Sequence, residues 1–344
     1  MNKPGKPVIL VTGATGFVGS YLLRYLVRNQ AGRIRALRRD QSSIHLVGEV
    51  AGQVDWVNCD ILDITGLEEA MKGVDYVYHC AAVVSYHPQE YDHMHLVNVE
   101  GTANVINAAL AAGIQRLVHI SSIAALGRPK DQFVLSESTQ WQRSKYISPY
   151  ALSKYLGEME VWRGIAEGLN AAIINPSTVL GSGFWNQGTA VYFKKVWQGL
   201  PVYPQGATGF VDVRDVAKAA IQLMDSGIQG KRFIINTVNW PFEKVLQAIA
   251  RELNKKQPGI RITPFLAGLI WRVEWLRNKI TGSKPFLTRE TAYQSVHNYA
   301  YDSSAWQKQF ASPFIPLEKT IEETCRQLQI AADNGWTPAA LPLK

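Results

Sequence analysis

The stretch from residue 8 to residue 22 constrains the fold of this chain more than any other. It begins with an apolar run at 8–11, rich in β-branched residues and too short for a helix, which predicts a parallel strand buried on both faces. Three glycines follow at the spacing GxxGxxG, and apolar residues then recur at helical intervals from Phe17. A strand, a glycine turn and a helix in this order are the local structure that binds a dinucleotide.

Each glycine of this turn has a predicted role. Gly13 permits the tight turn, Gly16 lets the backbone approach a pyrophosphate at the positive end of the helix, and Gly19 lets that helix lie close to its strand. An ordinary corner between a strand and a helix is the structural alternative. Further residues of the turn are predicted to contact the cofactor, namely Thr15, Phe17 and Val18.

Length, composition and charge agree with a globular protein. A chain of 344 residues with 47% hydrophobic and 19% charged residues can bury a large core, in one big domain or two lobes. The net charge of +8 is spread along the chain, which favours an attraction for phosphorylated ligands. No basic stripe interleaved with aromatic residues is visible, so we expect a small-molecule substrate and no nucleic acid.

The cysteines and the first residues indicate a cellular location. The three cysteines are odd in number and lack metal-binding spacing, which predicts buried, reduced thiols at Cys59, Cys80 and Cys325. The short, polar stretch before residue 8 does not read as a signal peptide, and no apolar run reaches the roughly 18 residues that a membrane span needs. We therefore expect a cytoplasmic protein without a membrane span.

Four histidines are candidate metal ligands. Their spacing places them on a predicted strand, a loop and the start of a helix, with no carboxylate placed to complete a coordination shell. The sequence therefore predicts no metal site at His79, His87, His93 and His95.

Strand and helix patterns alternate along the first half of the chain. Alternation of this kind predicts a doubly wound α/β fold of the Rossmann type, with a parallel sheet. Further strands are expected at 33–37, 54–58, 74–79, 117–120 and 171–174, and helices at 66–72, 97–112 and 149–166. The polar segment 126–146 is expected to be a loop. Gly113 is expected to end the helix predicted at 97–112.

The end of the second strand bears on the choice of cofactor. Arg38 takes the first position after the strand, and Asp40 falls two residues later. An acidic residue at this end bonds the ribose 2′-hydroxyl of NAD, whereas the planar fork of an arginine suits the 2′-phosphate of NADP. The pattern favours NADP, with NAD and a pair of solvated arginines as the alternatives.

Other strand ends are predicted to meet at the edge where ligands bind in open α/β sheets. Asp60 either accepts a hydrogen bond from an adenine amino group or caps the next helix. Small residues after the fourth strand leave room for a cofactor, and the loop 83–87 can line a substrate pocket. The predicted cofactor residues are Asp60, Ile61, Ala81, Ala82, Pro176 and Ser177, and the predicted substrate residues are Ser85, Tyr86 and Asn175.

Chemistry is predicted at Ser122, Tyr150 and Lys154. Tyr150 and Lys154 lie four residues apart on a predicted helix, so they project from one face. An ammonium one turn away is expected to lower the pKa of a phenol, and moving it from about 10 to about 7 needs roughly 4 kcal/mol. Tyr150 then passes a proton while hydride moves between a nicotinamide and a carbonyl carbon, and Ser122 donates to the substrate oxygen. The alternative is a surface Tyr–Lys pair.

Six segments together resemble an extended short-chain dehydrogenase/reductase, the superfamily of NAD-dependent epimerases and dehydratases. They are TGATGFVG at 12–19, NVEGT at 98–102, SS at 121–122, YALSK at 150–154, NPSTVLG at 175–181 and FVDVRDVA at 210–217. The resemblance covers roughly residues 7–330. It implies a seven-stranded doubly wound sheet with a smaller C-terminal substrate lobe. It also implies a catalytic triad of Ser122, Tyr150 and Lys154, with Asn98 ordering a proton-relay water.

The branch of this family is less defined. Sugar dehydratases carry an acidic pair where this chain has Ile123 and Ala124, and sugar-nucleotide epimerases usually carry an acidic residue where it has Arg38. The chain is more similar to the branch of dihydroflavonol reductases and 3β-hydroxysteroid dehydrogenases, which act on a ketone or aldehyde. We therefore expect an NAD(P)-dependent oxidoreductase. The alternatives are a nucleotide-sugar epimerase with tightly bound NAD and a non-catalytic NADP-binding module. Asn175 departs from the arginine often found before this proline.

The second half is expected to form the smaller lobe. We place an NAD(P)-binding domain at 1–175 and an α/β substrate-binding lobe at 176–344, with parts of 205–240 returning to the first sheet. Asp212 is expected to cap a helix, and the apolar segment 264–280 is expected to be a lid or part of the core, with a dimer surface or a membrane-interfacial helix as alternatives. A homodimer is the expected assembly.

Overall fold

A seven-stranded parallel sheet forms the centre of the protein, in a computed structural model that describes residues 6–129, 133–142, 147–263, 265–266, 268–269, 271–273, 277 and 297–343. The strand order is β11-β7-β5-β4-β1-β2-β3, and each neighbouring pair is parallel. The strands are β1 (Val8–Thr12), β2 (Arg33–Arg38), β3 (Asp55–Asn58), β4 (Tyr76–His79), β5 (Arg116–Ile120), β7 (Ala171–Pro176) and β11 (Arg232–Ile235). The order reverses between β1 and β4, so the predicted doubly wound fold is confirmed.

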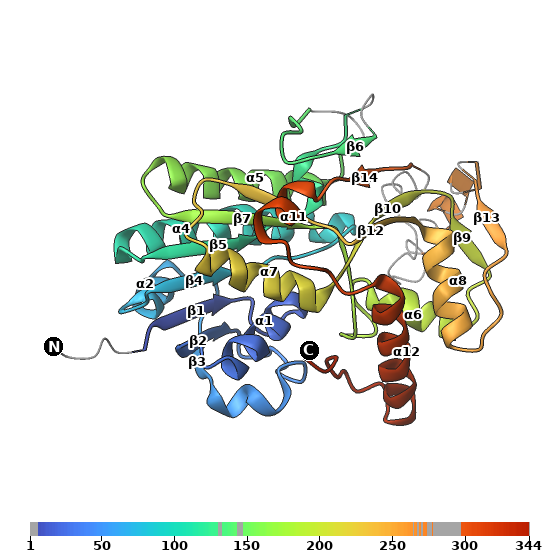
Figure 1. Cartoon of the computed structure of the whole chain (residues 1–344), viewed down its shortest axis with the longest axis horizontal. Coiled ribbons are helices and arrows are strands. Elements are labelled where there is room, and N and C mark those ends of the chain that lie inside the picture. The colour runs from blue at the N-terminus through green and yellow to red at the C-terminus, as the bar shows by residue number, and fades with distance from the viewer. Residues whose placement is uncertain are drawn as a thin grey trace.

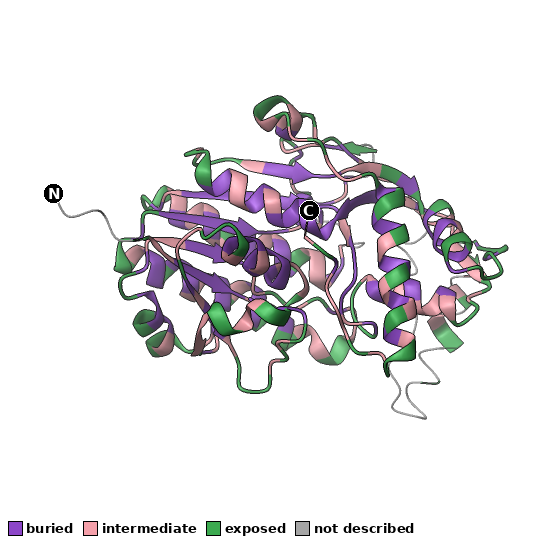
Figure 2. Cartoon of the chain, turned by 60° about the horizontal axis from the view of Figure 1, so that its bottom comes forward, coloured by how far each residue is buried: buried purple, intermediate pink, exposed green. Residues whose placement is uncertain are grey.

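Helices cover both faces of this sheet (Figure 1). On one face lie α1 (Phe17–Arg28) and α7 (Val213–Asp225), and on the other lie α2 (Ile64–Met71), α4 (Gly101–Ala112) and α5 (Pro149–Ala166). Successive residues of β1 alternate between the two cores, because Val11 packs with α1 and α7 whereas Leu10 packs with α2 and α4. Both are fully buried, as the β-branched run predicted. Figure 2 shows the strands in the colour of buried residues.

A second, smaller group of elements has its own core. It contains a three-stranded sheet in the order β12-β10-β8, in which β10 is parallel to β8 and antiparallel to β12. The elements are β8 (Thr178–Leu180), α6 (Ala190–Trp197), β10 (Ala207–Asp212), β12 (Val238–Pro241), α8 (Phe242–Glu252) and α12 (Leu317–Asp333). Phe193, Phe210 and Ile249 are buried in this core. Figure 1 shows α6, α8 and α12 to the right of the main sheet. The division into 1–175 and 176–344 stays a prediction.

Short elements complete the structure. Two small parallel pairs join β9 (Val202–Pro204) to β13 (Ile260–Ile262) and β6 (Val134–Leu135) to β14 (Ala300–Tyr301). The remaining helices are α3 (Tyr91–His95), α11 (Ser304–Phe310), a π-helical segment at Leu96–Glu100, and 3-10 turns at Gly48–Gln53, Pro88–Glu90 and Ile123–Leu126. Within the described residues, no helix has the length and hydrophobicity to cross a membrane.

Two expectations about local structure need correction, and a third concerns a segment that lies largely outside the described residues. The predicted helix at 97–112 begins earlier, at Tyr91, and passes through the π-helical segment before α4. Gly113 ends α4 in the left-handed conformation, as predicted. The segment 126–146 contains the strand β6, which the absence of any periodic pattern had hidden. Parts of 264–280 are helical, but much of that segment lies outside the described residues.

The close approach of α1 to the β1–α1 turn leads us to predict how a substitution at Gly19 changes stability. A Cβ at Gly19 would lie 2.2 Å from the carbonyl oxygen of Gly13, which is backbone and has little room to move. We expect Gly19→Ala to lower the free energy of unfolding by more than about 2 kcal/mol, measured by urea denaturation. The control is Gly52→Ala, because nothing lies within 4 Å of that Cβ. Equal stability of the two variants would contradict the close-approach interpretation.

Candidate functional site

The turn between β1 and α1 packs tightly against the end of β4. Gly13 has a φ of +64°, and a Cβ there would lie 2.5 Å from the backbone nitrogen of Ala81. Gly16 is the N-cap of α1 and has no side chain to cap the helix, and no acidic residue lies in the first turn. The first N–H groups of α1 are therefore open to an anionic group at this edge of the sheet, so the turn fits the diphosphate of a dinucleotide.

Arg38 is the last residue of β2, so the strand is one residue longer than predicted, and Asp40 lies two residues beyond it. The guanidinium of Arg38 lies over the ring of Trp56 at 5.8 Å. The carboxylate of Asp40 accepts a hydrogen bond from the Asn58 amide of the neighbouring strand. The acidic residue is thus engaged with β3, and the arginine stands at the carboxyl end of β2.

Asp60 does not cap the next helix. Its Oδ1 accepts from the backbone nitrogen of Leu62 at 3.0 Å, whereas Asp63 is the N-cap of α2 and accepts from Gly66 at 3.0 Å. The capping alternative for Asp60 is therefore wrong. Ile61 is buried next to it. A contact of Asp60 and Ile61 with adenine stays a prediction.

Ser122, Tyr150 and Lys154 lie together at the carboxyl end of β5. Ser148 caps α5 and accepts from Ala151 at 3.0 Å, which fixes the first turn that carries Tyr150. The Ser122 hydroxyl lies close enough to the Tyr150 phenol to lower its pKa in part. Lys154 is one turn further along the helix, and its Nζ donates to the carbonyl oxygen of Ile120 at 3.3 Å. The structure therefore brings all three predicted residues to one place.

Burial dominates the electrostatics of this group. Burial raises the pKa of Tyr150 above its usual value, and the Ser122 hydroxyl lowers it in part. Burial also lowers the pKa of Lys154 to about 8, against the opposing charge of Glu158. The predicted lowering of the Tyr150 pKa by Lys154 is not seen, because the ammonium is directed at a backbone carbonyl and the phenol is desolvated.

The loop 83–87 is held against α5. Asn98 in the π-helical segment accepts from the backbone nitrogen of Val83 at 2.7 Å and donates to its carbonyl oxygen at 2.9 Å. The same amide donates to the Ser153 hydroxyl on α5 at 2.9 Å. The side chain of Asn98 is thus fully engaged with protein groups. Its ordering of a proton-relay water stays a prediction.

The two residues predicted to contact substrate from this loop have different surroundings. Ser85 is buried, and its hydroxyl donates to Glu90 at 2.5 Å. The ring of Tyr86 packs edge-on against the ring of Tyr150, with centroids 5.7 Å apart. Tyr86 therefore lies beside the predicted proton donor, whereas the hydroxyl of Ser85 serves the loop itself.

The end of β7 supplies Asn175, Pro176 and Ser177. Asn175 is fully buried, and its Nδ2 donates both to the carbonyl oxygen of Ser122 at 3.0 Å and to Glu158 at 2.7 Å. The amide nitrogen therefore binds protein groups, whereas the amide oxygen is buried without a hydrogen-bond partner within the described residues. A contact of Asn175 with substrate stays a prediction. The buried hydroxyl of Ser177 has no hydrogen-bond partner within the described residues. An unsatisfied buried hydroxyl is compatible with a polar cofactor group at this strand end.

Comparison with known proteins decides the family. A model of the NAD dependent epimerase/dehydratase family matches residues 9–236, which contain the glycine turn, Ser122, Tyr150 and Lys154. This chain belongs to that family. The resemblance noted in the sequence is thereby confirmed.

Relatives of this family member span nearly the same length. A Synechocystis protein, provisionally named a dihydroflavonol 4-reductase, is 28% identical over 93% of this chain and 94% of its own. A rice (Oryza sativa subsp. japonica) protein named cinnamoyl-CoA reductase 1 is 30% identical over 75% of this chain and 79% of its own. The crystal structure of gox2253 superposes with a TM-score of 0.81 at 28% identity, covering 96% of this chain and 99% of that one.

One residue at the site of this family member escaped the sequence analysis. Glu158 lies eight residues after Tyr150 and four after Lys154, and its side chain is 2% exposed. A glutamate on the same helix face as a predicted catalytic pair was the signal that could have revealed it. In addition, no cluster of three potential metal ligands occurs in the part of the chain that the structure describes.

Two buried histidines beside Lys154 predict acid sensitivity. Burial lowers the pKa of His79 to about 3 and that of His119 well below its usual value. Their rings lie 5.0 Å apart, and neither ring nitrogen of His119 has a partner within the described residues. Because the unfolded chain takes up protons below pH 6.5 and the folded chain does not, stability is full above pH 6.5 and is lost as the pH falls.

We therefore expect each histidine to lower the free energy of unfolding by about 2 kcal/mol as the pH falls from 6.5 to 5, at about 1.36 kcal/mol per pH unit. His119→Phe should lose about half of this pH dependence, measured by urea denaturation at several pH values. The exposed His45 is the control, and His45→Gln should keep the dependence of the unmodified protein. An unchanged slope in His119→Phe would contradict the assignment.

Proposed function

We propose that this protein is an NADP-dependent oxidoreductase acting on a carbonyl or hydroxyl group of a small organic substrate. The convergence of Ser122 and Tyr150, with Lys154 one helical turn along α5 and bonded to the last residue of β5, carries the proposal. These side chains follow β5 and begin α5, at the same sheet edge as the uncapped first turn of α1. A proton donor thus stands at the edge where doubly wound sheets bind dinucleotides.

Tyr150 is proposed as the proton donor. Because burial raises its pKa, its hydroxyl is protonated at neutral pH, which suits reduction of a carbonyl whose oxygen gains a proton. The Ser122 hydroxyl would donate a second hydrogen bond to that oxygen, and the Lys154 ammonium would stabilise negative charge there. A nicotinamide bound at this edge would supply or take the hydride. Tyr86 would line the substrate side of Tyr150.

NADP is the proposed cofactor, with NAD as the alternative. The guanidinium of Arg38 is spread over Trp56 at the carboxyl end of β2, where the adenosine ribose lies in this fold. One oxygen of the Asp40 carboxylate accepts from Asn58 on β3. A planar guanidinium suits the two acceptors of a 2′-phosphate.

A ketone or aldehyde is the proposed substrate. The names of two relatives, dihydroflavonol 4-reductase and cinnamoyl-CoA reductase 1, are those of reductases, and we extend this reaction type to the present chain. A homodimer and a cytoplasmic location are further proposals that rest on the sequence.

Tyr150→Phe tests the proton donor. We expect NADPH affinity within about twofold of the unmodified protein and a fall in turnover of at least about 10²-fold, because a phenyl ring cannot pass a proton. The assay follows NADPH absorbance with a panel of ketones and aldehydes. Tyr155→Phe is the matched control, since Tyr155 stacks on Trp141 with ring centroids 4.1 Å apart. Full turnover in Tyr150→Phe would end the assignment.

Arg38→Ala tests the cofactor. We expect the Kd for NADPH to rise by about 30-fold and that for NADH to change little, since a charge-assisted contact with the 2′-phosphate is worth about 2 kcal/mol. Titration of the intrinsic fluorescence measures both values. Arg33→Ala is the control, because Arg33 pairs with Asp55 at the start of β2. An equal loss for the two cofactors would indicate NAD.

A further inference from the structure

Glu158 is the centre of a buried hydrogen-bond network behind the catalytic group. Its Oε2 accepts from the Ser121 hydroxyl at 2.6 Å and from the Asn175 amide at 2.7 Å. Its Oε1 accepts from Arg232 at 2.9 Å and from the indole of Trp162 at 3.3 Å. Four donors fill the acceptor positions of one carboxylate.

Two of these donors lie next to Ser122, at the carboxyl ends of two neighbouring strands. Ser121 precedes it on the chain, and Asn175 donates to the Ser122 carbonyl oxygen at 3.0 Å with the same nitrogen that bonds Glu158. One carboxylate therefore ties the ends of β5 and β7 to α5. The position of the Ser122 hydroxyl relative to Tyr150 depends on this tie.

The carboxylate also faces Lys154 across one helical turn. The titratable groups that act on the Lys154 ammonium are Glu158 on the same helix, His79 on β4, Cys80 after β4, and His119 on β5. Burial keeps both histidines neutral and raises the pKa of the Cys80 thiol to about 12, so it too is neutral. The negative charge that opposes the desolvation of Lys154 is therefore that of Glu158.

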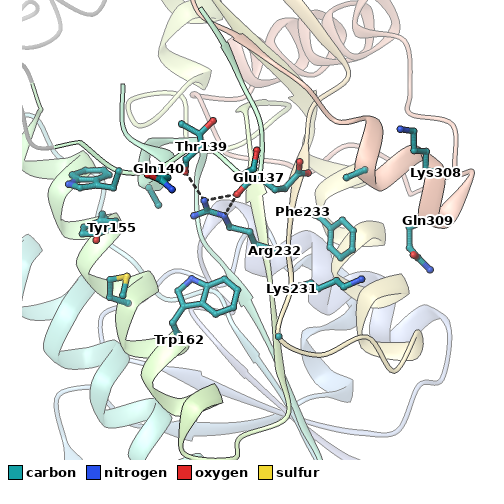
Figure 3. Close-up of a pocket in the computed structure, with 16 residues that line it drawn as sticks. Glu137, Thr139, Gln140, Tyr155, Trp162, Lys231, Arg232, Phe233, Lys308 and Gln309 are labelled. Atoms are coloured by element: carbon teal, nitrogen blue, oxygen red, sulfur yellow. Dashed lines mark hydrogen bonds between the residues drawn. The ribbon is translucent and has the colours of Figure 1, made fainter. Parts of the chain in front are cut away.

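Arg232 anchors the carboxylate from the opposite side. Its remaining nitrogens donate to the carbonyl oxygens of Glu137 at 2.7 and 2.9 Å and of Thr139 at 3.1 Å, as Figure 3 shows. This guanidinium lines a hollow of about 840 Å³, which Trp162 also lines. Ser122, Tyr150 and Lys154 do not line this hollow. Arg232 therefore reaches the protein surface at a place separate from the candidate site.

We propose that Glu158 is a positioning residue, whose carboxylate holds the strand ends that carry Ser122 and supplies the negative charge that faces the Lys154 ammonium. The proposal rests on the proposed function, because it assigns this residue a part in the same reaction. It gives Glu158 two separable effects, one on geometry and one on charge.

The charge effect is measured without any substrate. The full-length protein is labelled with ¹³C at the lysine ε-carbon, and the Lys154 signal, identified by its loss in Lys154→Met, is followed by NMR between pH 6 and pH 11. We expect Glu158→Gln to lower the titration midpoint of Lys154 by about one pH unit or more. Arg232→Gln should raise it, because the carboxylate then acts without its counter-charge. A purely structural role would not move the two variants in opposite directions.

The geometric effect is measured by turnover. In Glu158→Gln we expect kcat to fall by at least tenfold and the KM for NADPH to change less than threefold, with the alkaline limb of the kcat profile shifted to lower pH. The matched control is Glu160→Gln. Glu160 is on the same helix, but its carboxylate pairs with Arg163 at the surface. This variant should leave kcat and the Lys154 midpoint unchanged. Glu158→Asp, which keeps the charge, should restore the midpoint in part.

The outcomes separate the two proposals. If the unmodified protein reduces no carbonyl in the panel, the proposed function fails, and the NMR titration still tests Glu158. Should Glu158→Gln not fold, the double variant Glu158→Gln with Arg232→Gln removes the unpaired guanidinium and should still lower the midpoint. An unchanged Lys154 midpoint together with an unchanged kcat profile in these variants would overturn the role of Glu158.

Discussion

Parallel pairing of all seven strands is the constraint on which the rest of this structure depends. Parallel strands need crossover connections, so their carboxyl ends collect at one edge of the sheet. The glycine turn after β1, Arg38 at the end of β2, Ala81 after β4 and Ser122 after β5 reach that edge for this reason. A site assembled in this way needs no proximity along the chain, because the sheet supplies it.

Desolvation is the second determinant of the site. Helices on both faces of the sheet bury Lys154, and burial lowers its pKa to about 8 while it raises that of Tyr150. In such surroundings a charge is stable only with partners, and Glu158 has four donors and an ion pair with Arg232. The chemistry available at the edge is thus set as much by what surrounds the catalytic side chains as by their identity.

The sequence predicted well whatever is local and periodic. Short β-branched runs such as 8–11 became central strands, because only burial on both faces suits them. The spacing of Gly13 and Gly19 matched the close approach of α1 to its turn. Less local features were missed. The strand β6 has two residues and pairs with β14 far along the chain, so no periodic signal marks it. Asp63 caps α2, whereas the sequence analysis considered only Asp60 for that cap.

Taken by itself, the sequence determined the fold class and the family, because strand runs, glycine spacing and helical spacing are local properties. It also predicted Ser122, Tyr150 and Lys154, which the structure brings together. Tertiary structure alone decided the direction of each pKa, the engagement of Asn175 with Glu158, and the pairing of Glu158 with Arg232. Those depend on desolvation and on contacts between residues distant in the chain, and both exist only once the sheet and its helices have packed together.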